Sequence, residues 1–141
     1  MNKVSSYNIG VAAEAFAAGF FARFGFNISV QYGANQPEYD LLVVKDDSII
    51  KVSVKGSQTG SWGLIQAYKK KGVTYHDAAN MWANAHSSKT VICLVQFYKT
   101  EKAEAPRIYL AFPHEIADQL KTAETDMAIQ YYMSTIRGNP A

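Results

Sequence analysis

One acidic residue and one lysine stand where two neighbouring strands would bring them to the same end of a sheet. Asp40 opens a strand-like run that ends at Lys45, and Lys55 closes the next such run, which begins at Ile49 after a short polar turn. An antiparallel hairpin of these runs makes Asp40 and Lys55 neighbours. A carboxylate there could hold a hard divalent cation, while the lysine orients or helps to deprotonate a water. The pattern predicts the outline of a site that hydrolyses phosphodiester bonds.

The second of these runs has two different faces, because side chains alternate along a strand with a period of two. Ile50, Val52 and Val54 share one face, and Ile49, Lys51, Ser53 and Lys55 share the other. Ser53 therefore accompanies Lys55 on the face of the predicted site.

A helix is predicted in front of these strands. Apolar residues recur there at helical spacing from residue 7 to residue 24, namely Ile9, Ala13, Phe16, Phe20 and Phe24. Ser5 or Ser6 could cap its start, and Gly25 could end it because glycine tolerates the left-handed conformation.

The remaining pattern predicts an α/β domain with a central mixed sheet flanked by helices, in the order α-β-β-β-α-β-β-α. A loop rich in Gly and Ser is expected at 56–63, outside the core, after a loop at 35–37. The other expected elements are strands at 28–31, 39–45, 89–99 and 107–112, and helices at 76–86, 114–121 (opened by Pro113) and 124–133. We expect one domain over residues 1–136 and a frayed tail over 137–141.

The segments Pro37-Glu38-Tyr39-Asp40 and Lys51-Val52-Ser53-Val54-Lys55 resemble the motif of the PD-(D/E)XK nuclease superfamily. That superfamily has the restriction-endonuclease-like fold and includes restriction enzymes and Holliday-junction resolvases. By motif the resemblance covers residues 10 to about 56, and the later elements agree with the fold in order alone. It implies a restriction-endonuclease-like core and a site that uses Mg²⁺ or Mn²⁺.

The resemblance also implies a role for each matching residue. Asp40 matches the first motif acid, a metal ligand, and Lys55 matches the motif lysine. Glu14 matches an acidic residue that many members carry on the first helix, where it completes or supports the metal site. The backbone carbonyl of Val54 matches the position that commonly lends the metal an oxygen.

Ser53 departs from the motif, because the family usually has Asp or Glu two residues before the lysine. A neutral hydroxyl is a weaker ligand for a hard cation than a carboxylate. Metal affinity should fall unless Glu14 compensates, so Ser53 is counted with Glu14, Asp40 and Lys55 as a catalytic candidate that decides whether the site works.

Two functions from different classes follow from these residues. The first is a metal-dependent endonuclease that hydrolyses phosphodiester bonds in DNA; the short chain leaves little room for a recognition domain, which favours selection of DNA structure over sequence. The alternative is a catalytically impaired nuclease-fold module that binds nucleic acid or a protein partner. A third, plainer possibility is an interaction protein that uses the fold only as a scaffold.

Substrate contacts are expected from Gln58, beside the site, and from the basic cluster Lys69, Lys70 and Lys71. A plain loop and a solvated turn are the simpler interpretations of the same residues. His76, His86 and His114 lack the spacing of zinc ligands. Cys93 lies in an apolar run and is expected to be buried as a small hydrophobe.

Composition adds little about partners. The net charge is +2, from 14 Lys and Arg against 12 Asp and Glu, so a basic surface would need local clustering. No stretch is apolar enough for a signal or a membrane span, which predicts a cytoplasmic protein without a membrane partner. No motif for a small organic cofactor is present. A homodimer is compatible with the sequence, with Tyr131 and Tyr132 as candidate interface residues.

Overall fold

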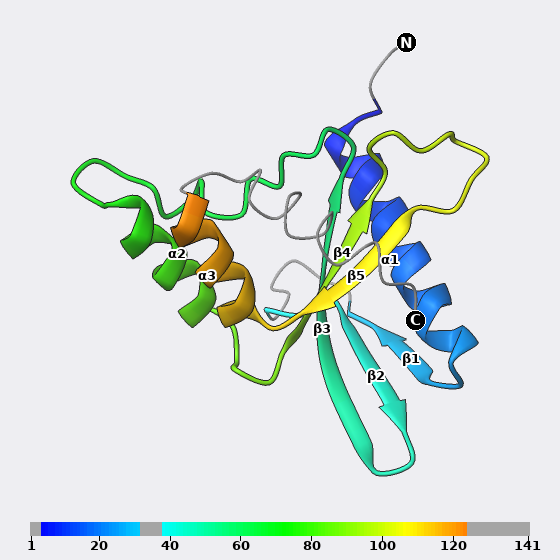
Figure 1. Ribbon diagram of the computed structural model, residues 1–141. Coiled ribbons are helices and arrows are strands. Elements are labelled where there is room, and N and C mark those ends of the chain that lie inside the picture. The colour runs from blue at the N-terminus through cyan, green and yellow to red at the C-terminus, as the bar shows by residue number, and fades with distance from the viewer. Residues whose placement is uncertain (1–3, 32–37, 124–141) are drawn as a thin grey trace.

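A five-stranded sheet with helices on both faces forms the described part of the chain (Figure 1). The computed structural model describes residues 4–31 and 38–123. In chain order the elements are α1 (Ser6–Arg23), β1 (Asn27–Val30), β2 (Leu41–Lys45), β3 (Ser48–Ser57), α2 (Tyr75–Asn84), β4 (Val91–Gln96), β5 (Arg107–Ala111) and α3 (Pro113–Ala123). The predicted α/β class and the order of these eight elements are confirmed.

The strands lie side by side in sequence order, from β1 at one edge to β5 at the other. All neighbours are antiparallel except β3 and β4, which are parallel and are joined by the crossover that contains α2. The sheet is therefore mixed, as predicted. Leu41 of β2 pairs with Val52 of β3, which fixes the register of the predicted hairpin.

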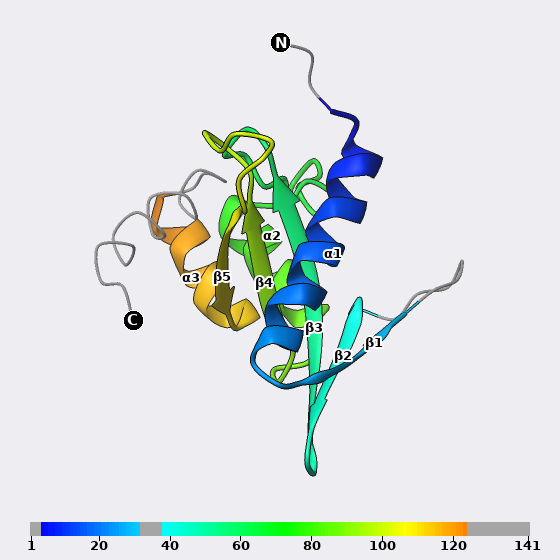
Figure 2. The ribbon, with the colours of Figure 1, turned by 90° about the vertical axis from the view of Figure 1, so that its right-hand side faces the viewer.

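The sheet separates two hydrophobic clusters, and Figure 2 shows the resulting layers, with α1 on one side and α2 and α3 on the other. The cluster under α1 contains Val52 and Val54 of β3. The cluster under α2 and α3 contains Ile92 and Leu94 of β4. The predicted alternation in β3 is confirmed: Val52 and Val54 point toward α1, so Ser53 and Lys55 belong to the face of α2 and α3.

Helix α1 begins and ends as predicted, but it buries a different stripe of residues. Ser5 caps it by accepting a hydrogen bond from the Asn8 N–H at 3.1 Å, and Gly25 follows its end with φ +91°. The buried residues are Ala13, Ala17 and Phe21, whereas Phe16 and Phe24 are 42% and 62% exposed. Small alanines let the helix lie closer to the sheet than the predicted row of phenylalanines would allow.

The prediction of a loop outside the core over residues 56–63 is wrong in two respects. Gly56 and Ser57 continue β3. Trp62 is only 8% exposed and belongs to the cluster under α2 and α3. The loop does not project away from the domain. The Ser57 hydroxyl donates to the Ser61 carbonyl at 2.8 Å and accepts from the Gly60 N–H at 3.0 Å. These bonds fold the segment back so that the indole reaches the core.

Some predictions fall outside the described residues: the loop at 35–37, the helix at 124–133, the tail at 137–141, and the tyrosines at 131 and 132. Within the described ranges, no helix combines the length and the apolar character that crossing a membrane requires.

Candidate active site

A polar pocket of about 360 Å³ lies on the face of the sheet that α2 covers. Asp40, Ser53 and Lys55 line it together, as the predicted hairpin requires. The other lining residues come from the segment before β2, the connection after β3 and the end of α2: Glu38, Leu64, Tyr68, Trp82, Ala85 and His86. Residues far apart in the sequence therefore meet in one hollow.

Asp40 is held in place at the point where β2 begins. Its Oδ2 atom accepts a hydrogen bond from the Val54 N–H at 2.7 Å, and its own N–H donates to the Val52 carbonyl at 2.8 Å. A carboxylate that accepts a backbone N–H is oriented as well as stabilised. Val54 thus contacts Asp40 through its N–H, while its side chain packs under α1.

Ser53 and Lys55 differ in how much of them solvent reaches. Ser53 is 1% exposed, whereas Lys55 is half-buried, and both residues line the pocket. A buried neutral hydroxyl fits the strand without the desolvation cost that a buried carboxylate would carry. The pocket therefore has one cationic side chain beside Asp40 and a neutral group at the motif position.

Glu14 lies on α1, whose buried stripe packs against the other face of the sheet, and it is not among the residues that line the pocket. Its pKa is nevertheless raised, first by burial and then by the negative charge of Asp40. The two carboxylates therefore repel each other. A cation near both would relieve that repulsion, but the structure does not bring Glu14 into the pocket itself.

Glu38 is a pocket residue that the sequence prediction missed. Its Oε1 atom accepts a hydrogen bond from the Thr90 hydroxyl at 2.7 Å. Its Oε2 atom is buried, and no described residue forms a hydrogen bond with it. The available signal was the position of Glu38 two residues before Asp40 in the quoted motif segment.

The end of α2 supplies residues that were also missed. The Nδ1 atom of His86 lies 3.0 Å from the Trp82 carbonyl, and because a carbonyl only accepts, Nδ1 carries the proton in the neutral ring. Nε2 is then the ring nitrogen without a proton, an acceptor. His86 follows Trp82 by four residues, the spacing of side chains on one face of a helix, and this spacing could have indicated a shared location.

The predicted substrate-binding residues lie elsewhere. The Gln58 amide nitrogen donates to the Val4 carbonyl at 2.7 Å, which ties the start of the chain to the end of β3. Lys69, Lys70 and Lys71 are exposed on the connection between β3 and α2, and of that stretch Tyr68 lines the pocket. The lysines could reach a long ligand that extends beyond the pocket, but they do not form its wall.

The oxygen atoms at the pocket suit a hard cation in type, although they are few. Asp40 keeps one oxygen beyond the bond to Val54, and Glu38 offers the buried Oε2 that lacks a hydrogen-bond donor. Mg²⁺ is commonly held by one or two carboxylates and retains several waters. Over residues 4–31 and 38–123, no group of three or more His, Cys, Asp or Glu gathers as a metal cluster. The fit is therefore to a cation held by two carboxylates at most.

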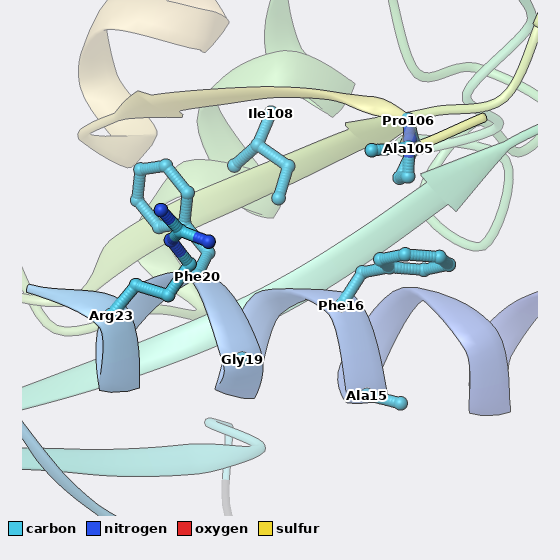
Figure 3. A pocket seen from close by; sticks show the side chains of 8 residues that line it. All are labelled: Ala15, Phe16, Gly19, Phe20, Arg23, Ala105, Pro106 and Ile108. Atoms are coloured by element: carbon cyan, nitrogen blue, oxygen red, sulfur yellow. The ribbon is translucent and has the colours of Figure 1, made fainter.

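A second cavity, of about 500 Å³, is apolar and contains none of the predicted site residues (Figure 3). In this view Phe20 projects from α1 on the side of Ile108 of β5, with Arg23 beside it, and the Phe16 ring lies on the side of Ala105 and Pro106. Phe16, which the helical spacing assigned to the core, is exposed and lines this surface groove.

Comparison of the chain with models of protein families, with curated proteins and with solved structures finds no match. The pocket is therefore the feature of this protein from which a function can be inferred.

Proposed function

We propose that this protein is a metal-dependent nuclease with a restriction-endonuclease-like core, which hydrolyses phosphodiester bonds in DNA. The observation that carries the proposal is the shared pocket of Asp40, Ser53 and Lys55. The antiparallel β2–β3 pair followed by a helical crossover to a parallel β4 supports it, because this arrangement places the motif residues beside an open polar hollow.

Each residue has a task that its position supports. Asp40, oriented by the Val54 N–H, would hold Mg²⁺ or Mn²⁺, which supplies Lewis-acid polarisation of a phosphate oxygen when bound. Lys55 would position the attacking water and offset negative charge as it develops on the phosphate. Ser53 is neutral, so it adds no negative charge that would repel the phosphate.

A nuclease-fold module that binds without cleaving is the second candidate, and two observations favour it. Ser53 is both neutral and 1% exposed, so it adds no anionic ligand. The structure also gathers no cluster of three metal-ligating side chains in the described ranges. Such a module would use the same pocket and the exposed lysines to hold nucleic acid or a protein partner.

Cleavage assays separate the two candidates. Supercoiled plasmid, linear duplex, single-stranded DNA and a four-way junction are incubated with the protein in Mg²⁺, Mn²⁺ or EDTA. Asp40→Asn is preferred to alanine because an amide oxygen can still accept the Val54 N–H. Lys55→Ala is matched by Lys102→Ala, which removes the same charge from an exposed turn.

We expect metal-dependent cleavage that falls by at least about 100-fold in Asp40→Asn and Lys55→Ala, and that is unchanged in Lys102→Ala. Cleavage that survives both pocket variants would come from a contaminant and would refute the assignment. Binding of DNA by folded protein without cleavage in any metal would select the second candidate.

A further inference from the structure

The pocket contains an acidic residue that the motif does not account for. Glu38 and Asp40 both line it, and so does Ser53, which stands at the usual acidic position of the motif. The site has thus lost one carboxylate at residue 53 and holds another at residue 38.

Glu38 is fixed and is not a solvated surface side chain. The Thr90 hydroxyl holds its Oε1 atom at 2.7 Å, and Thr90 itself is fully buried immediately before β4. The other oxygen is buried, and the described residues provide it with no hydrogen-bond donor. A buried carboxylate oxygen without a partner is unfavourable, because it has lost water and gained nothing in return. Glu38 lines the pocket, so a small rotation of its side chain would present this oxygen to a ligand bound there.

The carboxylates that line the pocket indicate a cationic ligand. A hard cation prefers carboxylate oxygens, and Asp40 presents its own carboxylate to the same hollow. Glu14, the residue expected to compensate for Ser53, is on α1 and does not line the pocket.

We propose that Glu38 supplies the carboxylate that Ser53 lacks, so that a divalent cation binds between Glu38 and Asp40. This inference rests on the proposed metal-dependent function. Glu14 then acts on the site only through its charge, and the lost acid has been replaced from the neighbouring segment and not from the helix.

Mn²⁺ binding, measured by calorimetry on the full chain, tests the inference without relying on activity. Glu38→Gln keeps an oxygen for the Thr90 hydroxyl and removes only the negative charge. We expect its Mn²⁺ affinity to fall at least about tenfold, as in Asp40→Asn, while Glu14→Gln changes it less than about threefold. Adding Ser53→Asp to Glu38→Gln should restore binding, because it returns a carboxylate at the motif position.

Melting in EDTA shows that each variant is folded, and Glu38→Gln should melt close to the wild-type temperature because the amide oxygen can still accept from the Thr90 hydroxyl. Unchanged Mn²⁺ binding in Glu38→Gln, together with loss in Asp40→Asn, would overturn the role of Glu38 and leave the nuclease proposal standing. Loss of binding in Glu14→Gln but not in Glu38→Gln would return the role to the helix. A folded wild-type protein that takes up no Mn²⁺ would overturn both proposals.

Discussion

Replacing Gly56 with alanine should destabilise the protein, although alanine normally suits a strand better than glycine. Gly56 lies in β3, directly after Lys55, where α1 crosses the sheet. A Cβ atom built there would lie 2.8 Å from the Ala13 Cβ and 3.2 Å from the Ile9 Cγ2. The first distance is below van der Waals contact, and neither neighbour is the end of a long flexible side chain.

The magnitude follows from two opposing terms. Alanine in place of glycine gains about 0.5–1 kcal/mol in backbone entropy, whereas overpacking a close contact costs about 1–3 kcal/mol. We therefore expect a net loss in the free energy of unfolding, measured by urea denaturation, of up to about 2.5 kcal/mol and centred near 1 kcal/mol. Gly10→Ala is the matched control: Gly10 lies on α1, and a Cβ there meets nothing within 4 Å, so this change should stabilise the helix.

A double-mutant cycle identifies the contact. Ala13→Gly should destabilise the wild type by about 1 kcal/mol through helix propensity, yet should recover part of the loss when combined with Gly56→Ala. Equal or higher stability of Gly56→Ala relative to the wild type would refute the reasoning, and so would strict additivity of the two changes.

The remaining predictions concern two titrating groups. The pKa of Glu14 is raised in the fold above its ordinary value, by burial first and by the charge of Asp40 second. The contribution of Glu14 to stability is therefore present below the unfolded pKa and is lost as pH rises through the folded pKa. Glu14→Gln should therefore reduce the loss of stability between low and neutral pH, and it should leave the protein more stable than the wild type at pH 7 in EDTA. Denaturation curves at pH 3 and pH 7 measure both effects. A variant that is less stable than the wild type at pH 7 would contradict the prediction. Burial also raises the pKa of Cys93 to about 12, so a thiol reagent at pH 8 should label the folded protein only as fast as it opens, and rapid labelling equal to that in denaturant would contradict the buried position.

The sequence predicted the elements well, because their signals are local. Helical spacing, the Ser5 cap and Gly25 define α1, and the alternation of Val52 and Val54 with Ser53 and Lys55 defines the faces of β3. The caps depend on single residues and the faces of the strand on a period of two, so each can be predicted from a short stretch of sequence.

The parts that were missed depend on contacts between remote segments. Helix α1 buries Ala17 and Phe21 beside the predicted Ala13, and it approaches Gly56 of β3 closely at Ala13. No local pattern reports that approach, which sets the face that the helix turns to the sheet. The position of Glu38 depends on a hydrogen bond from Thr90, which lies 52 positions further along the chain, so no local pattern indicates it. Trp62 entered the core because its loop is folded back by Ser57, which composition alone could not show.

The pairing of β3 with β4 has a consequence for the order in which the pocket assembles during folding. The floor of the pocket, with Asp40, Ser53 and Lys55, belongs to the β2–β3 hairpin, whose pairs are close in sequence. Its wall, with Trp82 and His86, comes from the crossover and is positioned when β4 joins β3. Contacts of low sequence separation form at lower entropic cost. We therefore expect the floor to form before the wall, so that mutations in α2 mainly speed unfolding and mutations in the hairpin slow folding.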